Sequence, residues 1–283
     1  MTKRILIAYA NKPLRHSLVL LTTEARYMHV FDKVIGYTEK DLSPELLASP
    51  LMQYARGGGY WAWKPYIIWK TLQEYDEGDI ICYLDSGCKV HTSSEWDEYF
   101  SLMEQYDTLC FQYQPDVQLW KEFYQQTSSA IKHWAKKTTV DFFKDRFKDD
   151  AFLDFRKIWG GAVFCKGKGN AFIKEWFDIT LSHPELVSDP TNEELNDQYP
   201  FFSGYHRHDQ AIITPLAYHH QKEGNLLVLP EMFDINREAD CIKADRRKPT
   251  GMKYYTTLAT IHLNGIFGEK RMKKIKRLFS PKS

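Results

Sequence analysis

The sequence predicts an α/β protein with a mainly parallel, Rossmann-like central sheet and a helical insertion. Strand-like apolar runs alternate with helical patterns over the first 115 residues, an alternation typical of parallel sheets. The run Asp79–Asp85 is continuously apolar between its two acids, as expected of a central strand covered on both faces. The stretch 119–154 is charged and helical in pattern, which marks it as the insertion.

Each element follows from local periodicity. Helices are expected where apolar residues recur at spacings of three and four, and strands where β-branched and aromatic residues form short runs. The helices are predicted at 18–27, 66–75 and 210–217. The strands are predicted at 4–10, 33–37, 79–85, 158–166, 225–230 and 256–263.

Composition limits the classes of function. The 283 residues include 38 basic and 37 acidic side chains, a formal net charge of +1, which argues against a nucleic-acid partner held by bulk electrostatics. The five cysteines are odd in number and lack C-x-x-C spacing, so a zinc framework or a complete disulfide set is not predicted. Free thiols, and an N-terminal apolar run too short for a signal peptide, favour a cytoplasmic protein.

The end of the chain has its own character, and we expect a domain over 1–265 followed by a tail over 266–283. The tail holds seven Lys or Arg and one acid, Glu269. Its apolar residues recur at spacings of three and four, namely Met272, Ile275, Leu278 and Phe279. Such a basic amphipathic segment can lie on an anionic membrane surface; the alternative is a solvated tail with a few core anchors.

Asp85 ends the central predicted strand, in Tyr83-Leu-Asp-Ser-Gly-Cys88. The carboxyl edge of an α/β sheet is where ligands bind, so Asp85 and Ser86 are candidates for ligand binding. A carboxylate beside a diphosphate needs a cation between them, and hard oxygen ligands favour Mg²⁺ or Mn²⁺. The alternative is an acid that merely caps the following turn.

A glycine-rich run lies upstream, Arg56-Gly-Gly-Gly-Tyr-Trp-Ala-Trp-Lys-Pro65. Glycines let the backbone approach a ligand or adopt positive φ, and Arg56 and Lys64 supply charge for a diphosphate. The spacing matches neither the dinucleotide fingerprint nor the P-loop. The alternative is a flexible turn before a helix whose tryptophans pack in the core.

These two runs, joined by a helix, resemble a group of bacterial GT-A-fold glycosyltransferases that act in capsule, O-antigen or lipooligosaccharide assembly. The likeness spans roughly 1–265 and extends more distantly to glycogenin-like enzymes. In those families the strand ends in Asp-x-Asp, which binds Mn²⁺ or Mg²⁺ and the donor diphosphate. Here Asp85 matches the first acid, and Gly87 stands at the second position. A late histidine ligates the metal in glycogenin-like enzymes, and His262, at the end of the last predicted strand, matches it.

The resemblance implies further site residues. Gly160 and Gly161 match the start of a strand that lines the donor-sugar pocket; the alternative is a β-bulge. Asp209 and Gln210 match an Asp-Gln pair beneath the sugar, and we expect them to be catalytic. The alternative for Asp209 is an N-cap of the helix that follows.

The sequence therefore predicts a glycosyltransferase that moves a sugar from a nucleotide-diphosphate donor to a glycan or lipid-linked acceptor. A UDP-sugar is favoured as donor, and the glycogenin likeness favours retention at the anomeric carbon. The end of the first strand, with Tyr9 and Ala10, is expected to hold the nucleotide. The alternatives are a nucleotidyltransferase, which normally carries a Gly-rich signature after its first strand, and a non-catalytic sugar-binding module, which would explain an aromatic content of 15%.

Overall fold

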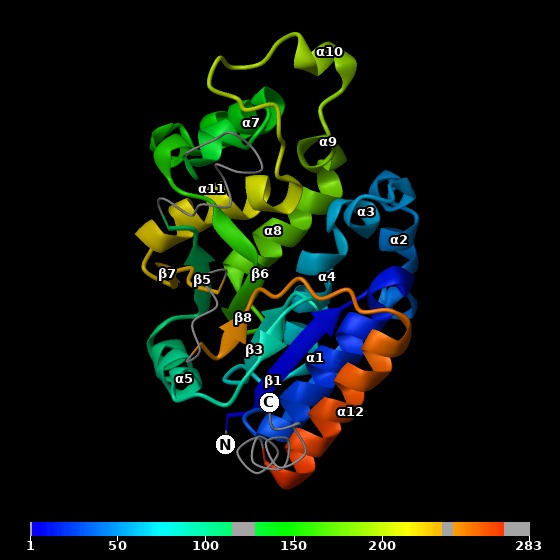
Figure 1. Cartoon of the computed structure of the whole chain (residues 1–283). Coiled ribbons are helices and arrows are strands. Elements are labelled where there is room, and N and C mark those ends of the chain that lie inside the picture. Colours follow the sequence, from blue (N-terminus) through cyan, green and yellow to red (C-terminus); the bar gives the residue numbers. More distant parts are fainter. Residues whose placement is uncertain (1, 115–127, 234–239, 269–283) are drawn as a thin grey trace, which may run out of the picture.

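A six-stranded mixed sheet forms the centre of the molecule (Figure 1). The computed structural model describes residues 2–114, 128–233 and 240–268. Five strands run parallel, and β6 runs antiparallel to both of its neighbours, so the predicted α/β class with a mainly parallel sheet is confirmed. Across the sheet the strands are β2 (Lys33–Tyr37), β1 (Arg4–Tyr9), β3 (Ile80–Leu84), β6 (Ile158–Cys165), β5 (Thr108–Gln112) and β7 (Leu226–Pro230).

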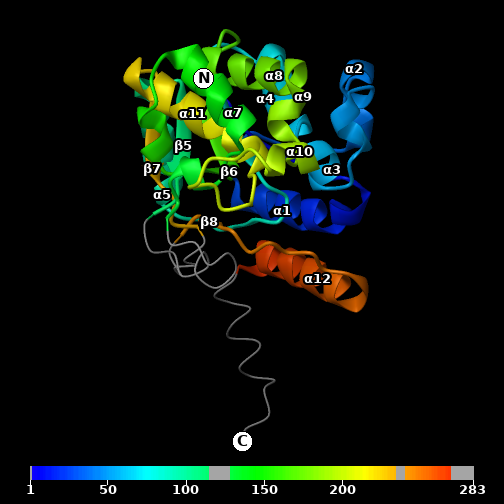
Figure 2. The ribbon, with the colours of Figure 1, turned by 90° about the horizontal axis from the view of Figure 1, so that it is seen from above.

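Helices cover both faces of this sheet (Figures 1 and 2). On one face lie α1 (Arg15–Met28) and α5 (Glu95–Gln105), where Trp96 stacks on Phe164 of β6. The other face carries α4 (Trp63–Glu74), α8 (Ala171–Ser182) and α11 (His208–Lys222). The expected apolar side of α4 is buried, including Ile67 and Leu72, and every residue of β3 and β6 is buried as well.

The strand order reverses at β1. The chain leaves β1 through α1 to β2 on one side, and β3 later joins β1 on the other. The connections therefore diverge beyond the carboxyl ends of β1 and β3, and such a reversal point opens a crevice for ligands. Between β2 and α4 the chain forms the short helices α2 (Pro44–Leu47) and α3 (Gly57–Tyr60).

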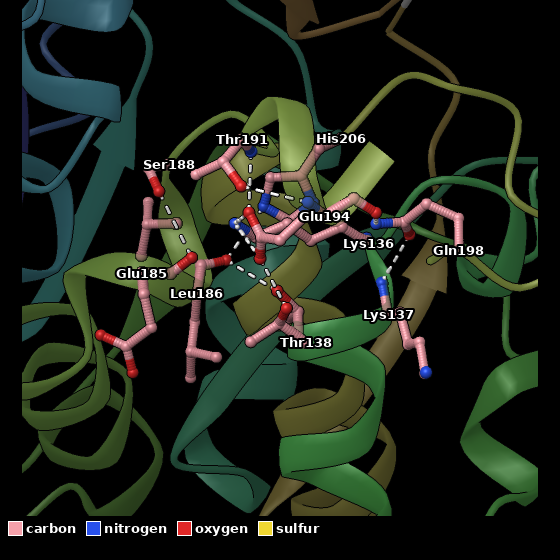
Figure 3. A network of polar contacts seen from close by, with 12 residues as sticks. Lys136, Lys137, Thr138, Glu185, Leu186, Ser188, Thr191, Glu194, Gln198 and His206 are labelled. Carbon is pink, nitrogen blue, oxygen red and sulfur yellow. Dashed lines mark hydrogen bonds and ion pairs between the residues drawn. The ribbon is translucent and has the colours of Figure 1, made fainter. Parts of the chain in front are cut away.

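A helical region lies beyond one end of the sheet (Figure 1). It contains α7 (Lys137–Phe147), α9 (Pro184–Val187) and α10 (Asn192–Leu195). Glu194 of α10 accepts hydrogen bonds from Lys136 and Thr138 at the start of α7, which joins two segments far apart in sequence (Figure 3). The predicted insertion over 119–154 is helical where the structure describes it; residues 115–127 lie outside the described ranges.

A second, two-stranded sheet brings a segment from near the end of the chain to the carboxyl end of β3. Its strands β4 (Lys89–Val90) and β8 (Ile242–Lys243) pair antiparallel. The chain after β8 then crosses the turn that follows β3, where the N–H of Arg247 donates to the carbonyl of Gly87 at 3.1 Å. We call residues 245–249 the basic strap, because it contains Arg246, Arg247 and Lys248.

The predicted strand over 256–263 is wrong. This segment lies within α12 (Gly251–Phe267), which packs against the outer side of α1 (Figure 2). Its threonines suggested a strand, but the hydroxyls of Thr256, Thr257 and Thr260 donate to carbonyls one turn earlier. Threonine is thereby accommodated in a helix, and its strand preference is overridden. The helix also continues past the expected domain boundary at residue 265.

Candidate functional site

A cavity of about 570 Å³ lies at the carboxyl ends of β1 and β3. This volume is within the range of small-molecule sites. Of the predicted residues it brings together Tyr9, Ala10, Asp85 and Ser86. Two hollows of about 710 and 860 Å³ lie elsewhere, one between α1 and α12 and one beside α8 and α11. Neither includes a residue at the end of β1 or β3, so the smaller cavity is the candidate site.

Aromatic rings form much of the cavity wall. Tyr9 stacks on Trp63 with ring centroids 4.1 Å apart, and Trp61 and Trp159 also line the space. Trp63 therefore fits both interpretations of the glycine-rich run, because its ring is buried in the core and also borders the cavity. Flat rings of this kind suit a nucleobase or a sugar face.

The glycine-rich run turns tightly at the cavity rim. Gly57 and Gly58 line it, with φ of 61° and 60°. Such left-handed backbone favours glycine. A Cβ at Gly57 would lie 2.4 Å from the ring of Trp61, and one at Gly58 would lie 3.0 Å from the amide nitrogen of Asn11. The glycines thus let the rim close against Trp61 and Asn11.

Lys64 lies behind this wall at the centre of a buried ion pair. Its side chain is 2% exposed, and its Nζ donates to Oδ2 of Asp209 at 2.6 Å and to the carbonyl of Gly160 at 2.7 Å. Oδ1 of Asp85 lies 3.4 Å from the same nitrogen. Lysine 64 was expected to bind a diphosphate, but its ammonium faces two carboxylates and a carbonyl instead.

Asp85 joins this buried pair to the cavity. Its N–H donates to the carbonyl of Gly161 at 2.9 Å, which fixes the end of β3 against β6. Its Oδ1 accepts a short hydrogen bond from the hydroxyl of Tyr83. Burial, followed by the Asp85 charge, raises the pKa of Tyr83 well above its ordinary value, so this hydroxyl remains a donor. The Asp85 side chain is still 39% exposed, which leaves it open to a ligand.

Asp209 does not cap α11. The N-cap position is Arg207, and Asp209 lies inside the first turn, where its Oδ2 accepts from Lys64. Its Oδ1 accepts from the N–H of Gln210 at 3.0 Å, so the carboxylate bonds to the first turn of the helix without occupying its N-cap position. His208, just before it, has φ of 42°, and a non-glycine residue in this region stores strain that is common at functional sites. The Oε1 of Gln210 is buried and has no hydrogen-bond partner among the described residues.

The two glycines of β6 make room for side chains. A Cβ at Gly160 would lie 2.8 Å from Oδ2 of Asp209 and 3.3 Å from Nζ of Lys64. A Cβ at Gly161 would lie 2.4 Å from the ring of Trp159. Gly160 makes room for the ion pair, and Gly161 makes room for the ring of Trp159. Neither glycine is among the residues that line the cavity.

Arg56, at the start of the glycine-rich run, contacts an acid far along the chain. Its guanidinium donates to Oδ1 of Asp189 at 2.9 Å, and the hydroxyl of Tyr60 donates to the other oxygen at 3.0 Å. Asp189 follows α9, so these bonds join the glycine-rich run to the helical region. Arg56 is not among the residues that line the cavity.

The basic strap supplies cationic side chains that sequence reasoning missed. Arg246, Arg247 and Lys248 all line the cavity. Arg247 forms a bidentate pair with Glu24 of α1 at 2.7 and 2.8 Å, while Arg246 and Lys248 are exposed. No local motif marks the strap, because only the long-range pairing of β4 with β8 brings it here.

His262 does not join Asp85. It lies in α12, where its Nδ1 and the hydroxyl of Tyr27 are 2.8 Å apart, and it does not line the cavity. In the described ranges, no three His, Cys, Asp or Glu side chains come together in a way that could hold a metal ion. Asp85, the one predicted metal ligand at the cavity, already faces an ammonium group. The residues described here do not fit the expected Mn²⁺ or Mg²⁺ site.

No family model and no curated protein matches the chain. It is similar in fold to solved glycosyltransferases. One, involved in glycosylation of the major capsid of PBCV-1, is 10% identical, with coverage of 93% of this chain and 100% of the other and a TM-score of 0.43. The galactosyltransferase LgtC, with donor and acceptor sugar analogues, is 13% identical over 79% of this chain and 72% of its own, at a TM-score of 0.37.

A third, the glycosyltransferase GlyE of Streptococcus pneumoniae TIGR4, is 10% identical over 98% of this chain and 64% of its own, at a TM-score of 0.41. Likeness of this degree concerns the general fold alone.

Proposed function

We propose that the protein is a glycosyltransferase that takes a nucleotide-diphosphate sugar as donor. The observation that carries the proposal is the cavity at the ends of β1 and β3, where aromatic walls, a basic strap and an exposed carboxylate meet. A nucleotide sugar offers a base or ring for the aromatic walls, a diphosphate for the cations and hydroxyls for the carboxylate. A sugar-binding module would need the rings, but not these opposed charges.

The donor occupies this cavity in a defined direction. The end of β1, with Tyr9 to Asn11, holds the nucleoside, and the exposed side chains of Arg246 and Lys248 bind the diphosphate, since cations paired with phosphate oxygens give strong hydrogen bonds. Asp85 accepts hydrogen bonds from hydroxyls of the donor. The motif resemblance favours uridine as the base.

Transfer breaks the bond between the anomeric carbon and the diphosphate oxygen. The acceptor hydroxyl forms the new bond to that carbon and gives its proton to an oxygen of the departing diphosphate. Arg246 and Lys248 stabilise the negative charge on the departing diphosphate, and the carboxylates of Asp85 and Asp209 oppose the positive charge that develops on the sugar. Gln210 follows Asp209 in the chain, and we propose that its buried Oε1, which has no hydrogen-bond partner among the described residues, serves as a neutral acceptor. We propose retention of the anomeric configuration, following the motif resemblance.

The acceptor is a glycan or a lipid-linked saccharide of surface-polysaccharide synthesis, reached at the inner face of the cell membrane. The face of α12 supports this location, because Met252, Tyr255 and Ile266 are 76%, 64% and 65% exposed. The basic residues that follow, 269–283, lie outside the described ranges. No helix in the described part of the chain is long and apolar enough to cross a membrane.

A single assay separates the alternatives. The full chain is incubated with a panel of nucleotide sugars and short saccharide acceptors, and the released phosphates are identified by chromatography. Release of a nucleoside diphosphate with a lengthened acceptor supports the proposal. Pyrophosphate release from a nucleoside triphosphate and sugar phosphate indicates a nucleotidyltransferase. Binding with neither product indicates a sugar-binding module. The anomeric proton of the product, observed by NMR, tests retention.

A further inference from the structure

A buried ammonium group lies between Asp85, which lines the cavity, and Asp209, which does not. The three N–H donors of Lys64 face three acceptors, namely Asp209 Oδ2 at 2.6 Å, the Gly160 carbonyl at 2.7 Å and Asp85 Oδ1 at 3.4 Å. A lysine ammonium has three donors and no acceptor. Lys64 therefore has no N–H left for a phosphate, and its role is toward the two acids.

The surroundings keep this group charged. Burial alone would lower the pKa of Lys64, but the carboxylates of Asp209 and Asp85 raise it above its ordinary value. The absence of a side chain at Gly160 lets the pair close, since a Cβ there would be 2.8 Å from Asp209. The cation is built into the fold by α4, β6 and α11 together.

A second observation concerns Gly87, at the position of the second acid in Asp-x-Asp. A Cβ there would lie 3.2 Å from Cα of Arg246, and the carbonyl of Gly87 accepts from the N–H of Arg247. The basic strap therefore passes where a side chain at residue 87 would begin. The space that a second carboxylate at residue 87 would need is therefore occupied by the backbone of the basic strap, whose side chains are cationic.

From these two observations we propose that Lys64 is the built-in cation of the donor site, and that the protein binds its donor without a divalent metal ion. Lys64 neutralises and orients Asp85 and Asp209 from behind, and Arg246 and Lys248 supply the charge that the diphosphate needs. A divalent ion at Asp85 would lie next to a buried ammonium and would be repelled by it. That the ligand is a nucleotide-sugar donor rests on the proposed function. The role of Lys64 as the cation between Asp85 and Asp209 does not depend on it.

The first test uses the unaltered full chain and needs no activity. Mn²⁺ is titrated into the protein, and free Mn²⁺ is followed by electron paramagnetic resonance, alone and with UDP. We expect no saturable site in either case, and UDP affinity by calorimetry that is equal within about twofold in EDTA and in Mn²⁺. One Mn²⁺ bound per chain and lost in Asp85→Asn would overturn the inference, as would a tenfold fall of UDP affinity in EDTA.

The second test removes the built-in cation. Lys64→Met keeps an unbranched side chain one atom shorter and leaves two facing carboxylates without a cation, so we expect this variant to gain a saturable Mn²⁺ site that the unaltered chain lacks. A merely structural lysine would lose stability without gaining this signal, and a folded variant without it contradicts the role of Lys64. If the variant does not fold, the measurements on the unaltered chain decide alone. If no nucleotide binds under any condition, the proposed function fails. The Mn²⁺ titration then still tests whether Lys64 takes the place of a divalent ion between the two carboxylates.

Discussion

At the scale of single residues, Gly160 tests how closely the buried pair must pack. In Gly160→Ala the added methyl would lie 2.8 Å from Asp209 and 3.3 Å from Lys64. Overpacking of this kind costs about 1–3 kcal/mol, and here it also displaces the charges behind the cavity. We expect a lower melting temperature and a turnover at least tenfold lower. Gly169→Ala is the matched control, because a Cβ there meets nothing within 4 Å; equal behaviour of the two variants contradicts the packing argument.

Asp209→Asn separates charge from shape at the same pair. An N-cap would tolerate asparagine, but Asp209 holds a buried ammonium, and removing one partner of a buried pair costs about 3 kcal/mol. We therefore expect clear destabilisation in urea unfolding and a fall in turnover of about two orders of magnitude. Asp197→Asn is the control, since that acid is 77% exposed in its pair with Lys137 and such pairs contribute little. A variant of Asp209 as stable as this control would restore the capping interpretation.

The sequence indicates which residues carry chemistry better than it indicates what each one contacts. Asp85, Lys64 and Asp209 were all expected at the site, and they form one cluster. Their pairing was not foreseen, because Lys64 and Asp209 are 145 residues apart and meet only where α4 and α11 pack beside Gly160 of β6. Arg56 was expected at the diphosphate for its charge, but Asp189, far along the chain, takes its guanidinium.

At the scale of elements, a neutral histidine just before α11 joins the start of α7 to α9 (Figure 3). His206 is buried, its Nδ1 accepts from the N–H of Lys136 at 3.2 Å, and its Nε2 donates to the carbonyl of Leu186 at 2.9 Å. Burial, with the charges of His208 and Lys136, holds the pKa of His206 well below its ordinary value. Protonation therefore disrupts this contact.

The sign of the pH effect follows from linkage. Below the ordinary histidine pKa of about 6.5 the unfolded chain binds a proton that the folded chain does not. The free energy of unfolding should fall as pH drops from 7 to 5, by up to about 2 kcal/mol from this group. His206→Gln keeps an acceptor and a donor without titrating, so its stability should depend less on pH. Urea unfolding at both pH values measures the slope, and an unchanged slope contradicts the role of His206.

Elements with strong periodicity were predictable, and those set by distant partners were not. The buried runs of β1 and β3 and the apolar face of α4 correspond to the structure within a few residues. The two-residue strands β4 and β8 carry too little pattern to be recognised, and the basic strap depends on their pairing. The strand expected over 256–263 failed because threonine hydroxyls can bond within a helix as well as favour a strand.

At the scale of the whole molecule, α12 forms a separate surface on the outside of α1 (Figure 2). None of the α12 residues is fully buried, and Leu263, Ile266 and Phe267 near its end are 42%, 65% and 46% exposed. Seven Lys or Arg follow within the remaining residues. An apolar helix face followed by a basic segment is the combination that binds an anionic membrane surface.

Removing residues 269–283 should therefore weaken binding to anionic vesicles and spare the chemistry. Each basic residue near such a surface contributes about 1 kcal/mol, so the loss should reduce binding by several orders of magnitude in vesicle co-sedimentation at physiological salt. Turnover of a soluble acceptor should change little, because every described residue that lines the donor cavity is retained. Ile266→Ser with Phe267→Ser should weaken binding through apolar contact alone, and zwitterionic vesicles serve as the control. Equal sedimentation of the truncated and full chains would mean that the basic end does not bind the membrane.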